Sequence, residues 1–447
     1  MTQGLASRLL PKLGRNLSRP SKRAQTRRIE ARTIAGPYGY TQAKALIFSE
    51  YGEPKDVLQS VSCVPPPPPP LAVGSFQFKA NTSPQNRLHS HSISPSLPPS
   101  QLILRTLAAP INPADINTIQ GTYGAKPSFT SALGAQPPAA VPGNEGVFEV
   151  LATGSSSSSA DGAIQKGDWV IPAKSAFGTW RTHIQADISD VLKIPKDGLS
   201  PVQAATVSVN PCTAYRILRS YGPQKEAAAD EGLPMRPLEL GSGEFFIQNG
   251  ANSGVGRAAI QLGRAWGLRS INIVRERASP DETAALKDEL RALGATHVFT
   301  DAEFLQGSFR KTLDEVTRGA RPVGLALNCV GGPSAAALAK ALGEGGTLVS
   351  YGGMGRKGFA VPLGLQIFKE VRSVGFWLTK WNERDPEGRK HAVEYLLDLT
   401  RKGNFRDAPV EEVPWEWKTE VEGLRDAVGR GMEGFRGKKG VFVFGET

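Results

Sequence analysis

The stretch FFIQNGANSGVGRAAIQLGRAWGLRSINIVRER, from Phe245 to Arg277, constrains the fold more than any other part of the chain. Its apolar start, Phe245 to Gln248, indicates a short buried strand, and a glycine-rich turn follows. Beyond the turn, apolar residues recur at helical spacing: Ala258, Ala259, Leu262 and Ala265. A second apolar run, Ser270 to Val274, then completes the order strand, turn, helix, strand, which predicts a dinucleotide-binding βαβ unit.

The turn contains Gly250, Gly254 and Gly256 and directs the N-terminus of the following helix at whatever lies over it. Unpaired N–H groups and the positive end of the helix dipole suit a pyrophosphate, and glycines allow a close approach of the backbone. A glycine turn alone is weak evidence, because turns in any α/β protein use glycine. The flanking strand and helix make the pattern specific.

The second strand ends in Arg275, Glu276 and Arg277. A protein that binds NAD usually places a carboxylate here for the ribose 2′-hydroxyl. Arginines suit a 2′-phosphate instead, because they form charge-assisted and often bidentate hydrogen bonds with it. We therefore expect NADPH rather than NADH as cofactor.

The positive charge of the chain is concentrated at its N-terminus. Residues 1–40 contain nine Lys or Arg and one acid, Glu30, so they carry +8 of the formal net charge of +11 and leave +3 for the rest. A mildly basic body gives little support for general nucleic-acid binding. An Arg-rich segment with Ser and Thr and almost no acids is typical of a mitochondrial transit peptide, with a basic tail of no targeting role as the alternative.

A length of 447 residues predicts two domains rather than one. No apolar run reaches the length of about 18 residues that a membrane span requires. The three cysteines, Cys63, Cys212 and Cys329, are too few and too widely spaced for a disulfide framework or a thiolate metal site, which fits a reducing compartment.

Two polar insertions interrupt the globular sequence. Ordered structure is expected to begin near Ala43, with strands of a compact β-rich domain before and after residues 64–100. Those residues include six consecutive prolines, Pro65 to Pro70, and are expected to be a disordered insertion. Docking to an SH3 or WW module is the less favoured alternative. A second surface insertion is expected at Pro223 to Gly243.

After Arg277, helices and strands alternate, which predicts a doubly wound parallel sheet. The expected elements are helix 280–293, strand His297 to Thr300, strand Leu325 to Cys329, helix Ser334 to Leu342, strand Thr347 to Tyr351 and strand Ser373 to Trp377. Ligands bind beyond the carboxyl ends of such strands, so Asn328, Val330, Tyr351 to Met354 and Phe376 to Leu378 are expected to face the cofactor. A last strand, Gly440 to Phe444, suggests that the chain returns to the first domain.

A β-rich N-terminal domain, a late glycine turn and a C-terminal return resemble the medium-chain dehydrogenase/reductase superfamily. The segments APINPADINTIQGTYG, VPGNEG, FGTWRTH, VNPCTAYRIL, IQNGANSGVGRAAIQ, IVRER, SYGGM and GFWL resemble, more narrowly, the mitochondrial trans-2-enoyl-thioester reductases. The resemblance implies a transit peptide at 1–40, a GroES-like catalytic domain at 41–210 and 380–447, and a Rossmann NADPH domain at 211–379.

The resemblance also implies NADPH-dependent reduction of trans-2-enoyl-CoA or enoyl-acyl-carrier-protein thioesters in the mitochondrial matrix, as part of fatty acid synthesis, by a homodimer. Tyr123, in the turn GTYG, matches the catalytic tyrosine of the family. A phenol can supply a proton or donate a hydrogen bond to developing negative charge, and both roles stay open.

Further positions match cofactor contacts of the family. Asn210 matches a contact near the nicotinamide ribose. The pyrophosphate turn is matched by Ser253, Gly254, Val255 and Gly256. The 2′-phosphate end is matched by Arg275, Glu276 and Arg277. Tyr351, Gly352, Gly353, Met354, Phe376, Trp377 and Leu378 match contacts along the nicotinamide half, and Lys439 a C-terminal lysine, with Lys438 as a near alternative. As structural alternatives, Asn210 caps a helix and Phe376 and Trp377 are core.

Zinc is not expected. Zinc alcohol dehydrogenases of the superfamily carry a Gly-His-Glu turn, where this chain reads Gly143, Asn144, Glu145, and its five histidines are scattered. His183 is expected to be structural. Two other functions remain: a zinc-independent NADPH-quinone oxidoreductase, against which the context of Tyr123 argues, and a non-catalytic RNA-binding relative, against which the nearly neutral body argues.

Overall fold

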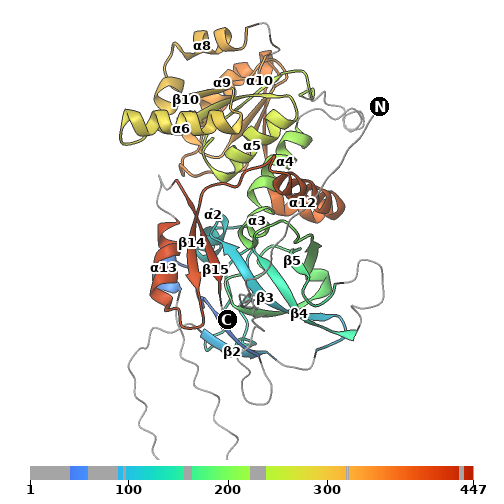
Figure 1. The fold of residues 1–447 in the computed structure, drawn as a ribbon. Helices are drawn as coiled ribbons and strands as arrows, with labels where there is room; N and C mark the ends of the chain where they lie inside the picture. The colour runs from blue at the N-terminus through green and yellow to red at the C-terminus, as the bar shows by residue number, and fades with distance from the viewer. Residues whose placement is uncertain are drawn as a thin grey trace, which may run out of the picture. The chain divides into compact units, whose positions relative to one another are not determined.

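The computed structural model describes residues 41–58, 89–93, 97–155, 164–221, 238–318, 320, 322–431, 437–445 and 447. The expected transit peptide and the proline run therefore lie outside the described residues. Two large sheets organise this part of the chain, one parallel and one mostly antiparallel (Figure 1). No helix in these ranges combines the length and the apolar character needed to cross a bilayer.

The parallel sheet has six strands in the order β10-β9-β8-β11-β12-β13. Their bounds are β8 Phe245–Gln248, β9 Arg269–Val274, β10 His297–Thr300, β11 Leu325–Asn328, β12 Thr347–Ser350 and β13 Arg372–Gly375. Numbered from β8, the order is 3-2-1-4-5-6, the doubly wound order of dinucleotide-binding sheets. The topological switch lies between β8 and β11, so the cofactor crevice is expected at the carboxyl ends of these strands.

Helices cover both faces of this sheet (Figure 1). They are α4 Asn210–Ser220, α5 Gly254–Ala265, α6 Pro280–Leu293, α7 Asp301–Phe304, α8 Phe309–Val316, α9 Gly332–Ala341 and α10 Leu363–Phe368. Their ends follow local chemistry: α6 begins where the Ser279 side chain accepts from the Glu282 amide and ends at Gly294, which has a left-handed backbone (φ 112°).

The second sheet has seven strands, in the order β14-β15-β3-β4-β5-β7 with β6 also paired to β3. The bounds are β3 Gln101–Pro110, β4 Val147–Thr153, β5 Trp169–Pro172, β6 His183–Asp187, β7 Val191–Ile194, β14 Val410–Trp415 and β15 Lys439–Phe444, with a 3-10 turn η3 at Ile188–Asp190. Three short helices accompany it: α1 Pro54–Val57, α2 Pro113–Ile119 and α3 Pro201–Thr206. Its core includes Leu104, Phe148 and Val170, which are completely buried.

The chain returns to this sheet at its C-terminus, as the sequence predicted. After β13 come α11 Leu378–Arg384 and α12 Pro386–Arg401, and α12 contacts α4 (Figure 1). The chain then forms β14, α13 Val421–Arg430 and β15, and β15 pairs antiparallel with β3. The strand β14, parallel to β15, was not predicted.

The structure corrects three expectations. Residues 64–100 are not wholly a disordered insertion, because His89–Ile93 form β2, antiparallel to β1 Thr41–Ala45, and Ile93 is buried. The second insertion also ends earlier than expected, since Leu238 is 1% exposed. Ala265 is exposed rather than part of the apolar face of α5, because the helix ends there and Trp266 packs against the core instead.

Candidate active site and cofactor site

Tyr123 lies in the turn that follows α2. The Asn112 and Asp115 side chains form a capping box at the start of α2. After the end of α2, the backbone amides of Thr122 and Tyr123 both donate to the Asn117 carbonyl. The Tyr123 hydroxyl accepts a hydrogen bond of 3.0 Å from the indole Nε1 of Trp377, and the two rings meet edge to face. Because the indole only donates, the phenol keeps its own proton for another acceptor.

The predicted pyrophosphate turn opens α5. Ser253 is the N-cap residue, and its hydroxyl accepts from the Gly256 amide at 3.1 Å. A Cβ on Gly256 would lie 2.5 Å from the Ala251 carbonyl oxygen, so only glycine fits there. Val255 is buried against the core. The remaining unpaired N–H groups of the first turn of α5, which includes Gly254, are those that a helix N-terminus offers to an anion.

The three residues after β9, Arg275, Glu276 and Arg277, differ in the groups that surround their side chains. The pKa of Arg277 is lowered mainly by desolvation and further by the charges of Arg275 and Arg257. Three arginines therefore lie near one another at the end of β9. The Glu276 carboxylate instead accepts from the Thr300 hydroxyl at 3.2 Å, toward β10. Glu276 is therefore engaged toward the neighbouring strand, and the guanidinium groups on either side of it in the sequence are the ones whose chemistry suits a phosphate.

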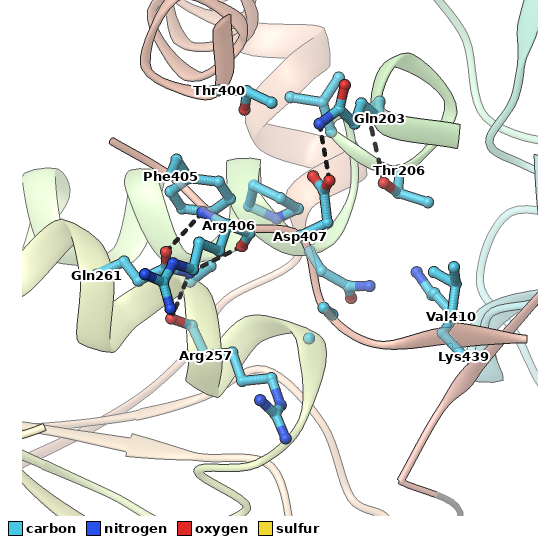
Figure 2. Close-up of a pocket in the computed structure, with 16 residues that line it drawn as sticks. Gln203, Thr206, Arg257, Gln261, Thr400, Phe405, Arg406, Asp407, Val410 and Lys439 are labelled. Atoms are coloured by element: carbon cyan, nitrogen blue, oxygen red, sulfur yellow. Dashed lines mark hydrogen bonds between the residues drawn. The ribbon is translucent and has the colours of Figure 1, made fainter. Parts of the chain in front are cut away.

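A small cavity of about 30 Å³ brings three predicted cofactor residues together: Asn210, Gly254 and Lys439 (Figure 2). Asn210 does not cap α4, because the N-cap position is Val209; its amide donates to the Asn112 side chain at 3.4 Å instead. Lys438 is exposed. The Lys439 ammonium is buried without a hydrogen-bond partner among the described residues, which makes Lys439 the better candidate of the two.

A second group of predicted cofactor residues follows β12 and β13. Tyr351 continues β12, and burial raises the pKa of its hydroxyl well above the ordinary value. Gly352 lies against Cys329, Gly353 borders open space, and Met354 is 60% exposed. The residues after β12 therefore differ in exposure, from the buried Tyr351 hydroxyl to the largely exposed Met354 side chain.

Phe376 and Trp377 differ in role. Phe376 is 6% exposed and stacks on Trp381, so its side chain belongs to the core, as one alternative anticipated. Trp377 contacts Tyr123 instead, and Leu378 begins α11 half-buried beside the core. Phe376 and Trp377 line an open hollow of about 380 Å³, together with Tyr221, Ser350, Gly375, Lys380, Trp381 and Arg384.

Sequence reasoning missed a buried polar network behind these residues. Glu145 is completely buried and accepts from the Asn112 amide at 2.9 Å and from the Val209 backbone at 2.7 Å. Asp115, also completely buried, accepts from the Asn144 amide and backbone, and burial raises its pKa to about 6. The signal was present in the turns INPAD and VPGNEG, whose acids sit among apolar residues.

No group of three His, Cys, Asp or Glu side chains in the described ranges is arranged to hold a metal ion. His183 is 1% exposed and lies 3.1 Å from the Thr182 hydroxyl. Burial, with the nearby Arg105 charge, lowers the pKa of His183 to about 4. A neutral, enclosed imidazole fits the structural role expected from the sequence.

The residues present fit a phosphorylated dinucleotide. The donor set consists of the helix N-terminus at α5, two arginines after β9 and the buried ammonium of Lys439, which lies 3.8 Å from the Glu145 carboxylate. All of these groups are cationic or donate hydrogen bonds, and the helix N-terminus and the arginines follow the carboxyl ends of β8 and β9 in the doubly wound sheet. An anionic ligand could accept hydrogen bonds from the Lys439 ammonium, which makes none to the residues that the structure describes.

Comparison with known proteins places this geometry in a family. The family described as zinc-binding dehydrogenase matches residues 254–395. The mitochondrial enoyl-[acyl-carrier-protein] reductase of Yarrowia lipolytica is 40% identical over 367 residues, 82% of either chain. The solved Etr1p/NADP/crotonyl-CoA complex superposes with a TM-score of 0.74 at 32% identity and covers 90% of this chain and 99% of that one.

A second solved structure, the mitochondrial 2-enoyl thioester reductase Etr1p/Etr2p heterodimer of Candida tropicalis, is 33% identical with a TM-score of 0.74. It covers 90% of this chain and 99% of its own. The match therefore extends over both sheets and not over the nucleotide-binding part alone.

Proposed function

This chain belongs to the mitochondrial enoyl-[acyl-carrier-protein] reductase family, and we propose on that basis that it reduces trans-2-enoyl thioesters with NADPH. The observation that carries the proposal is the joining of Tyr123 to Trp377, next to the edge of the sheet where the cofactor residues gather. The substrates are enoyl groups carried on CoA or on acyl carrier protein, in mitochondrial fatty acid synthesis.

Bound NADPH supplies the hydride that adds to the β-carbon of the enoyl group. The electron pair of the C=C bond moves toward the thioester carbonyl, and the α-carbon then takes a proton, so the saturated thioester and NADP⁺ are formed. Tyr123 is proposed to donate its hydrogen bond to the developing enolate oxygen. Trp377 holds the phenol from the opposite side, which orients the O–H away from the indole.

The cofactor is held, in this proposal, by residues from several segments. Ser253, Gly254, Val255 and Gly256 surround the pyrophosphate, Arg275 and Arg277 bind the 2′-phosphate, and Asn210, Tyr351, Gly352, Gly353, Met354, Trp377, Leu378 and Lys439 line the nicotinamide half. Phe376 contributes backbone, because its side chain is core. Glu276 is assigned a supporting role beside β10, since its carboxylate is engaged by Thr300.

The protein is proposed to act as a homodimer in the mitochondrial matrix, directed there by residues 1–40. Support for the dimer comes from the edge strand β13 and the adjoining α10, where three large apolar side chains are exposed: Leu363 (71%), Ile367 (64%) and Phe368 (82%). An apolar patch beside the last strand of a sheet is suited to a second copy of the chain.

We retain the division into a catalytic domain at 41–210 and 380–447 and a Rossmann domain at 211–379. Strands β14 and β15 support the return of the last segment to the first sheet. The contact of α12 with α4 indicates that the segment from about 380 to 401 also serves the second domain.

The test compares substrates on one preparation. NADPH consumption is followed with trans-2-hexenoyl-CoA, with the same compound and NADH, and with a quinone. We expect rapid turnover of the thioester and a clear preference for NADPH. Turnover with the quinone but not with the thioester would move the protein to the quinone oxidoreductases instead.

A further inference from the structure

We propose that Glu145 is a positioning residue for the nicotinamide half of the cofactor site, because its one buried carboxylate joins the segments that carry Asn210 and Lys439. The inference rests on the proposed function, which assigns both residues to NADPH. It adds a role for a residue that itself lines no cavity described above.

The first link runs from Glu145 to the start of α4. Its Oε1 accepts from the Val209 amide at 2.7 Å and from the Ser208 hydroxyl at 3.3 Å. Val209 is the N-cap residue of α4, and Asn210 follows it directly. The Glu145 carboxylate thus satisfies the N-cap amide, one of the donors that have no partner within the helix, and it fixes the backbone from which Asn210 projects.

The second link passes through Asn112. The Asn112 amide donates to Glu145 Oε2 at 2.9 Å, which turns its carbonyl oxygen outward. That oxygen accepts from the Asn210 amide at 3.4 Å. Since an amide has one acceptor end and one donor end, the carboxylate orients Asn112, and Asn112 in turn orients Asn210.

The third link is electrostatic. Lys439 Nζ lies 3.8 Å from Glu145 Oε2, beyond hydrogen-bond distance, and its ammonium is buried without a hydrogen-bond partner in the described ranges. Desolvation lowers the pKa of Lys439, whereas the Glu145 and Asp115 carboxylates raise it. Glu145 therefore favours the charged form of a lysine whose N–H donors stay available for a ligand in the cavity of Figure 2.

The geometry implies a selective effect. Asn210 and Lys439 serve the nicotinamide half, whereas Arg275 and Arg277 follow β9, on the far side of the β8 strand from β11. Removing the charge of Glu145 should weaken NADPH and leave the adenosine end untouched. A residue that merely supported the fold would weaken both.

The experiment measures dissociation constants on the full chain by calorimetry, with NADPH and with 2′,5′-ADP as a probe of the adenosine end alone. The variants are Glu145→Gln, Lys439→Met, the double variant, and Glu149→Gln as the control. Glu149, on β4 and four residues after Glu145, pairs with Arg105 of β3 at 2.7 Å. Apo melting temperatures are recorded for each variant.

We expect Glu145→Gln to raise the NADPH dissociation constant by about 10- to 100-fold, the range that loss of an outer-shell partner causes at metal sites, with 2′,5′-ADP unchanged. The double variant should lose less affinity than the sum of the two single losses, because part of the effect of Glu145 passes through Lys439. Glu149→Gln should bind both probes as the wild type does.

Two results would overturn the inference. NADPH binding unchanged in Glu145→Gln removes the positioning role, and an equal loss of NADPH and 2′,5′-ADP assigns Glu145 to general stability. Failure of the wild-type protein to bind NADPH at all would instead contradict the proposed function, and the positioning role would fall with it.

Discussion

The indole Nε1 of Trp377 donates to the Tyr123 hydroxyl across 3.0 Å, and this bond joins residues 254 positions apart in the sequence. Trp377 enters from the end of the parallel sheet and Tyr123 from the turn after α2. A tyrosine in a glycine turn is unremarkable alone. The hydrogen bond from Trp377, which follows the last strand of the parallel sheet, is what indicates a chemical role for Tyr123.

Replacement of Trp377 by Phe is expected to lower kcat about tenfold, because the phenol loses the donor that orients it while the aromatic wall remains. Tyr123→Phe is expected to lower kcat by about 10²-fold or more, with little change in the NADPH dissociation constant. Steady-state kinetics and cofactor binding measure both. Trp266→Phe is the matched control, since its indole also donates to a tyrosine, Tyr395, at 3.0 Å.

The cofactor preference should depend on the arginines after β9. Arg275→Ala combined with Arg277→Ala is expected to lower kcat/KM for NADPH by about 10- to 100-fold and to change the NADH value little, because only NADPH carries the 2′-phosphate. Arg291→Ala, a half-exposed arginine on α6, controls for the loss of positive charge. A preference that survived the double change would assign the 2′-phosphate to other groups.

Gly256→Ala tests the close approach at the pyrophosphate turn. Its Cβ would lie 2.5 Å from a backbone oxygen that cannot move aside, so we expect a loss of stability of about 1–3 kcal/mol and weaker NADPH binding. Chemical denaturation and calorimetry give the two values. Gly307→Ala, where a Cβ meets nothing within 4 Å, should change neither.

His183 should make stability depend on pH. Its folded-state pKa, about 4, lies below the ordinary value of about 6.5, so the unfolded chain binds more protons between these limits. The His183 contribution is therefore complete above about pH 6.5 and is lost as the pH falls toward 4. Asp115 acts oppositely, since its raised pKa of about 6 gives a contribution that is lost as the pH rises through that value.

The comparison of wild type with His183→Gln isolates the histidine, because Asp115 is common to both. We expect the difference in unfolding free energy between the two proteins to change by on the order of 1–3 kcal/mol from pH 7 to pH 4, with the wild type losing more. Denaturant titrations at several pH values give the curve. A constant difference would mean that His183 is not buried in the neutral form.

The dimer proposal depends on the exposed face of α10. Phe368→Glu, at a side chain that is 82% exposed, is expected to yield monomers while the fold is kept. Leu305→Glu, at 49% exposure on another helix end, serves as the control and should remain dimeric. Sedimentation velocity measures both. A wild-type protein that sediments as a monomer would remove the proposal.

The sequence predicted the parallel sheet well, because its strands are short buried runs between periodic helices: helix 280–293 has the bounds expected of it. It missed β14, whose residues VEEVPW include two adjacent glutamates and a proline, and β2, whose HSHSI lies among polar residues. The strand β14 forms because it pairs with β15, and β2 forms because it pairs with β1. Pairing between distant segments leaves no pattern in the local sequence.

The candidate site likewise contains residues that could be predicted from the sequence and residues that could not. Residues inside one continuous motif, such as Ser253 to Gly256, could be placed from the sequence. The network of Asn112, Glu145 and Lys439 could not, since its members come from three distant segments and Lys439 is brought in by the pairing of β15 with β3. The bond between Tyr123 and Trp377 was missed for the same reason, although each residue was singled out separately.

The most direct test of the proposed chemistry follows the label from NADPH deuterated at its transferable position into the product of trans-2-hexenoyl-CoA. We predict saturated hexanoyl-CoA with one deuterium on the β-carbon and a solvent hydrogen on the α-carbon, formed far more slowly by Tyr123→Phe. Absence of the saturated thioester, or deuterium on the α-carbon, would contradict hydride addition at this site.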